Sequence, residues 1–75
     1  MYSETISALL RAHPFVPFTI HVSDGKSFKV PHVDFALLTP TGQTLYVAVQ
    51  GEMVERINLA HVTRVSSESN VGIEN

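Results

Sequence analysis

The chain has 75 residues, no cysteine and a formal net charge of −2, and hydrophobic residues make up 44% of it. These values are typical of one small globular domain, and they exclude a disulfide framework, a thiolate metal site and intrinsic disorder. The few Lys and Arg residues are scattered, whereas strong nucleic-acid binding depends on clustered basic residues. The absence of cysteine fits a reducing cytoplasm, where we expect the protein. No apolar run approaches the roughly 20 residues of a membrane-spanning helix, so we expect that the chain does not enter a membrane.

The first predicted element is a short helix over residues 4–12. Ile6, Leu9 and Leu10 recur at spacings of three and four residues, which places them on one helical face. Ser3 is the expected N-cap because its hydroxyl can accept a bond from a free N–H of the first turn. The first proline of the chain ends the helix, since it has no N–H and pushes the preceding residue out of the helical region.

Two Pro-Phe steps over residues 13–18 then lead into an alternating strand that ends at Asp24 and Gly25. A two-residue loop at this turn would mix apolar and polar residues on each face of the hairpin. A three-residue loop over residues 23–25, with Gly25 in the left-handed region, keeps the large apolar residues on one side. The register that we predict pairs Phe18 with Val30, Ile20 with Phe28, and Val22 with Lys26.

Short apolar runs bounded by turn residues predict the remaining strands. They cover residues 35–40, 44–49 and 53–59, followed by a brief turn over 59–61 and a last strand over 62–65. The predicted fold is α+β: an N-terminal helix with a five- or six-stranded antiparallel bent sheet or small barrel over residues 1–66. Residues 67–75 are polar and lack periodicity, so we expect a flexible C-terminal tail.

Two resemblances follow from these residues. In outline, residues 6–66 resemble Sm-like and SH3-like barrels, through "LLRAH", "PFTIHVSDGKSFKV" and "INLAHVTRV". The Sm-like bacterial RNA chaperone has an RNA-binding Lys-His pair in its second conserved segment, where Asn58 and Leu59 stand here, so the likeness implies the fold more than RNA binding. The run "PFVPFTIHVSDGKSFKVPHVDF" with "INLAHVTRV" also resembles short uncharacterised bacterial proteins, which imply no function.

The segment "TLYVAV" is the best indication of function. Leu45 and Val47 belong to one apolar row, and Tyr46 belongs to a second row on the opposite face. A strand that is apolar on both faces is either buried on both or an edge joined to another subunit. We therefore predict a homo-oligomer, or a protein partner bound through this strand or its neighbour, with Phe15 and Phe35 either in the core or as exposed anchors. The alternative function is Sm-like RNA binding.

No residue set predicts catalysis, a metal site or a cofactor. The four histidines lack the spacing of metal ligands, and no Ser or Thr stands in a nucleophile motif. His32 and Asp34 form the one local polar pair, because residues two apart on an extended segment project to the same side. A carboxylate that orients an imidazole is one interpretation of this pair, and a solvated strand end is the other.

Overall fold

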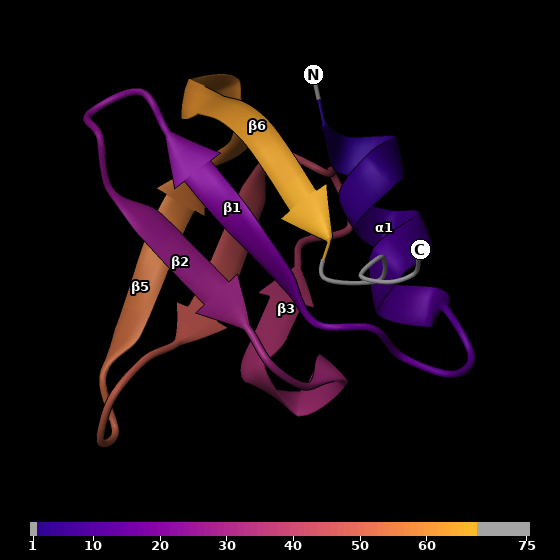
Figure 1. Cartoon of the computed structure of the whole chain (residues 1–75). Coiled ribbons are helices and arrows are strands. Elements are labelled where there is room, and N and C mark those ends of the chain that lie inside the picture. Colours follow the sequence, from indigo (N-terminus) through magenta and orange to yellow (C-terminus); the bar gives the residue numbers. More distant parts are fainter. Residues whose placement is uncertain (1, 68–75) are drawn as a thin grey trace, which may run out of the picture.

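The computed structural model describes residues 2–67 and shows one helix and six antiparallel strands, which confirms the α+β class (Figure 1). The elements in chain order are α1 (Ser3–Arg11), β1 (Phe18–Val22), β2 (Ser27–Val30), the 3₁₀ helix η1 (Val33–Phe35), β3 (Ala36–Leu38), β4 (Thr44–Ala48), β5 (Val54–Asn58), the 3₁₀ helix η2 (Leu59–His61) and β6 (Val62–Ser67). The predicted C-terminal tail lies outside the described residues, except for Ser67 at the end of β6. Among residues 2–67, no helix has the length and apolar character needed to cross a bilayer.

The strands form two three-stranded sheets, with orders β2-β1-β6 and β3-β4-β5. Figure 1 shows the first sheet crossing in front of the second, with α1 to one side. The chain passes from the first sheet to the second after Val30, where Pro31 offers no N–H for a ladder and η1 turns the backbone. This break explains why β2 and β3 follow each other in the sequence without pairing.

Helix α1 buries the face that the apolar spacing predicts. Ile6 is fully buried, and Leu9 and Leu10 pack against the core. The predicted N-cap is wrong, because Ser3 is the first helical residue and Tyr2 precedes it without a side-chain cap. The Tyr2 hydroxyl instead donates to the carbonyl oxygen of Thr63, at 3.1 Å, and so connects the start of the helix to β6.

The β1–β2 hairpin has the predicted register. Phe18 lies opposite Val30 and Ile20 opposite Phe28, and the backbone N–H of Val22 donates to the carbonyl of Lys26 at 2.9 Å. The three loop residues follow the predicted turn chemistry, with Gly25 at φ +91° and Asp24 accepting a bond from the Lys26 N–H at 2.9 Å.

Gly25→Ala should lower the free energy of unfolding by about 1 kcal/mol, because a residue with a Cβ is strained in the left-handed region. A Cβ at this position would meet nothing within 4 Å, so the loss reports backbone strain alone. Urea denaturation measures the difference. Gly25→Asn is the matched control and should lose less, since asparagine tolerates positive φ. Equal losses in the two variants would contradict this account of the turn.

The core lies between the two sheets and α1. Its buried side chains come from the helix, from five of the six strands and from η2. They are Ile6, Phe18, Ile20, Val30, Leu45, Val47, Ile57, Leu59 and Val62. Both sheets therefore turn one face inward, and what remains on the opposite face of each is available to solvent or to a partner.

Candidate interaction site

The outer face of the β3-β4-β5 sheet carries apolar side chains that the core does not cover. The antiparallel register places Leu37 opposite Tyr46 and Ala48 opposite Val54, all on the face away from Leu45. We call Leu37, Tyr46, Ala48 and Val54 the outer apolar face. Leu37 and Val54 are 64% and 60% exposed, and Tyr46 and Ala48 are partly buried. Large exposed apolar patches are a common feature of contact surfaces, which makes this face a candidate for one.

The two residues that flank Tyr46 in β4 point into the core, on the opposite face of the sheet. Leu45 and Val47 are fully buried in the core, opposite Ile57 and Glu55 of β5. Their side chains cannot touch a partner, so they leave the set of candidate interaction residues. The reason is the period of two along a strand, which sends neighbouring side chains to opposite faces of the sheet.

Strand β4, which lies in the segment "TLYVAV" that we considered as a possible sheet edge, is the central strand of its sheet. Strand β4 pairs with β3 on one side and with β5 on the other, so its own backbone has no edge for an added strand. The edges of this sheet belong to its two neighbours. A hollow of about 380 Å³ lies beside β3, with Leu10 of α1 and Leu37 among its lining residues.

The two candidate phenylalanines have separate environments. Phe15 is partly buried against the core, and its ring lies 5.9 Å from the ring of Phe18 and 6.1 Å from that of His32. It therefore holds the segment between α1 and β1 against the core. Phe35 is 41% exposed at the end of η1, so of the two it is the one with surface to offer a partner.

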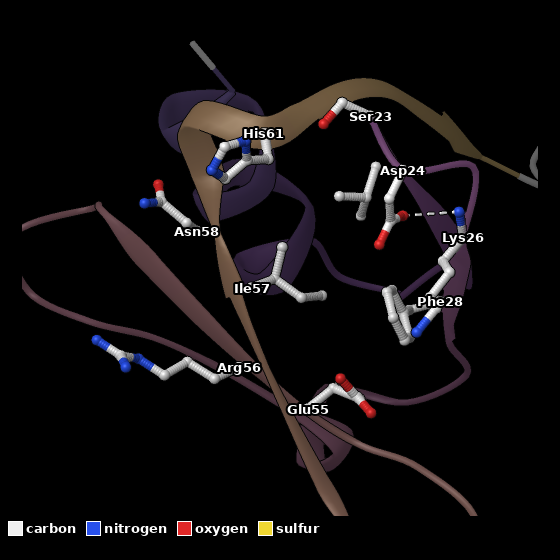
Figure 2. Close-up of a pocket in the computed structure, with 10 residues that line it drawn as sticks. Ser23, Asp24, Lys26, Phe28, Glu55, Arg56, Ile57, Asn58 and His61 are labelled. Carbon is white, nitrogen blue, oxygen red and sulfur yellow. Dashed lines mark hydrogen bonds between the residues drawn. The ribbon is translucent and has the colours of Figure 1, made fainter.

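A pocket of about 420 Å³ lies between the β1–β2 turn and β5 (Figure 2). Its apolar lining consists of Val22 and Phe28 on the hairpin side and Ile57 on β5. This volume falls in the range of about 300–1,000 Å³ that is usual for ligand sites. The pocket therefore has room for side chains of a partner and an apolar surface to receive them.

Charged groups surround this apolar lining. Asp24 and Lys26 lie on the hairpin side, and Glu55 points from β5 toward them, whereas Arg56 points to the other side of β5 (Figure 2). Glu55 is partly buried, yet within residues 2–67 its carboxylate has neither a hydrogen bond nor an ion pair. A carboxylate in this position can accept a charge-assisted hydrogen bond from a basic group.

The sequence did not predict this pocket, because Phe28 and Glu55 meet only through the packing of the two sheets. One signal for it was present in the sequence. Along β5 and into η2, Glu55, Ile57 and Leu59 alternate on the inward side, and Glu55 is the charged residue of the three. A charge at an inward position of an otherwise apolar row indicates a site at the rim of the core.

His32 and Asp34 are close but solvated. The segment is not extended as predicted, since Asp34 belongs to η1 and His32 caps that helix: the Asp34 N–H donates to Nδ1 of His32 at 3.4 Å. The carboxylate lies 3.7 Å from the same nitrogen, and the two side chains are 61% and 85% exposed. An Nδ1 that accepts the backbone bond has no proton to donate to the carboxylate, so this geometry is a helix cap rather than an oriented catalytic imidazole.

The other histidines do not converge on one place. His21 lies on the outer face of the first sheet, where Nε2 is 3.1 Å from Ser66 Oγ and 3.3 Å from Arg64 Nη2. His13 and His61 are exposed on other segments. In the part of the chain that the structure describes, no three His, Asp or Glu side chains are placed to hold a metal ion.

Comparison with known proteins gives no relative: the chain matches no protein-family model, no curated protein and no solved structure. The α+β class is established by the elements themselves. The likeness to Sm-like and SH3-like barrels, and the likeness to short bacterial proteins, stay predictions.

Proposed function

We propose that this chain is a non-catalytic protein-interaction module that associates with a second copy through the outer apolar face. The observation that supports this proposal is the pairing of Leu37 with Tyr46 on the sheet face opposite the buried core. Leu37 leaves 64% of its surface to solvent, in a chain too small to hide a large core. Covering these side chains with a second copy would remove apolar area from water, which is the main favourable term in association.

The composition of the face supports a protein partner rather than a nucleic acid. Tyrosine is enriched at protein interfaces because it has a large apolar body and a polar tip, and the Tyr46 hydroxyl has no hydrogen bond among residues 2–67. Leu37, Tyr46 and Arg56 lie side by side across the three strands, and Arg56 is the cationic residue among these three. A nucleic-acid surface would need several such charges, and its affinity would fall steeply with salt. Contact through apolar side chains should resist salt.

Tyr46→Lys should reduce self-association by about tenfold or more, since a buried lysine must lose its hydration at the interface. The fold should survive, because the side chain lies on the outer face and contributes nothing to the buried core. The measurement is the molar mass in solution by light scattering over a concentration series, with circular dichroism as the test of folding.

Ser27→Lys is the matched control for this variant. It places the same charge at an exposed position of β2, in the other sheet, and should leave the association constant unchanged. A Tyr46→Lys protein that associates as strongly as wild type would exclude the outer apolar face as the contact surface.

A further inference from the structure

We propose that β5 also binds an extended peptide segment of a partner protein by strand addition, and that the pocket beside it takes two side chains of that segment. One of these is apolar and the other is basic, and they lie two positions apart in the peptide. This inference rests on the proposal that the chain is an interaction module. It adds a second site and gives the chemistry of the segment that fits it.

The backbone of β5 has an open edge in the part of the chain that the structure describes, because its ladder partner there is β4. Two hydrogen bonds at the ends of that ladder show which residues of β5 bond to β4. The N–H of Val49 donates to the carbonyl of Met53 at 2.9 Å, and the N–H of Leu59 donates to the carbonyl of Gln43 at 3.0 Å. In an antiparallel pair, residues that bond the neighbouring strand alternate with residues that do not, so every second residue of β5 directs its N–H and C=O away from β4. The residues with these outward groups are Val54, Arg56 and Asn58.

A strand added at this edge would place its side chains in the pocket. Glu55 and Ile57 use their backbone groups to bond β4, so residues opposite them on the new strand occupy non-hydrogen-bonded positions. Side chains approach most closely at such positions. Both residues face the inner side of the sheet, where the pocket lies (Figure 2). Alternate residues of the peptide would therefore enter it, as in other peptides recognised by strand addition.

The lining of the pocket gives the chemistry of the two side chains. Ile57, Val22 and Phe28 offer an apolar surface, so the residue opposite Ile57 should be apolar. The residue opposite Glu55 should be basic, because it would supply the ion-pair partner that this carboxylate lacks among residues 2–67. Asp24 and Lys26 at the rim contribute one charge of each sign, and Arg56 points to the other side of β5 (Figure 2), so Glu55 is the charge that β5 directs toward the hairpin.

The probe is a fluorescein-labelled strand-forming peptide of threonines with one lysine and one leucine two positions apart. A second probe has glutamate in place of the lysine. Fluorescence anisotropy should show saturable binding of the lysine probe to the wild-type chain, and binding of the glutamate probe about tenfold weaker.

Arg56→Pro should abolish this binding, because proline removes an outward N–H and its ring obstructs the edge. The variant should still fold, since the ladder to β4 does not use the N–H of this residue. Arg56→Ala is the matched control: it removes the same side chain, keeps the N–H and should retain binding.

Glu55→Lys provides a test that does not depend on proline. This variant should prefer the glutamate probe over the lysine probe, which reverses the wild-type order. Binding that is unaffected by Arg56→Pro, or an order of probes that Glu55→Lys leaves unchanged, would overturn strand addition at β5. A wild-type chain that self-associates through Tyr46 but binds neither probe would also overturn it, while the proposed function would stand. A chain that does neither would contradict both proposals.

Discussion

Leu45→Lys is expected to unfold the domain at room temperature. Leu45 is fully buried on the inner face of the central strand β4, with Ile57 of β5 opposite. A lysine at this position would carry its charge into the core with no carboxylate opposite, and such a substitution costs more than about 4 kcal/mol. Circular dichroism of the purified protein should show loss of the strand signal, together with loss of the cooperative thermal transition.

Tyr46→Lys is the natural control, because it introduces the same residue at the next position of the same strand. The Tyr46 variant should keep its thermal transition, since its side chain lies on the outer face of the sheet. Two variants that unfold alike would show that both faces of β4 are structural, and the outer apolar face would then be part of a core rather than a contact surface.

Phe18→Ala should lower the free energy of unfolding by about 3–5 kcal/mol, which is the usual cost of removing a buried aromatic ring. Phe18 is fully buried on β1, the middle strand of its sheet, and its ring contacts that of Phe15. A domain of this size has a total stability of roughly 4–10 kcal/mol, so the variant should lose about a third of it or more. Urea denaturation, with the midpoint and slope compared to wild type, gives the difference.

Phe35→Ala is the matched control for Phe18→Ala. The same ring is removed at a position that is 41% exposed and outside the buried core, so the loss should stay within about 1 kcal/mol. Equal losses at the two positions would contradict the assignment of the core to the space between the two sheets.

The sequence predicted the β1–β2 hairpin in detail because two independent signals agreed there. The alternation of Phe18, Ile20 and Val22 defined the inward face, and the turn residues selected the loop length that matches it. The buried face of the helix was predictable for a similar reason. Ile6 and Leu9 are three residues apart and so lie on one side of a helix, and that side packs against the core. In each case the deciding interactions are local.

Predictions were weaker where the deciding contact is distant. The start of α1 was placed by a local capping rule, whereas the structure ties Tyr2 to Thr63 at the other end of the chain. The segment around Tyr46 is apolar on both faces, and periodicity alone cannot say which face turns inward or which strands flank it. The pocket was not predicted at all, because the hairpin and β5 form it jointly.

We propose that the outer apolar face binds a second copy of the chain. The measurement that decides this is the molar mass of the nuclease-treated wild-type protein by light scattering after size-exclusion chromatography, at low and at high salt. We predict an oligomer that is free of nucleic acid and keeps its mass at high salt, as expected for an apolar contact. A monomer at every concentration would exclude self-association through this face, and so would an oligomer that carries RNA and dissociates as salt increases.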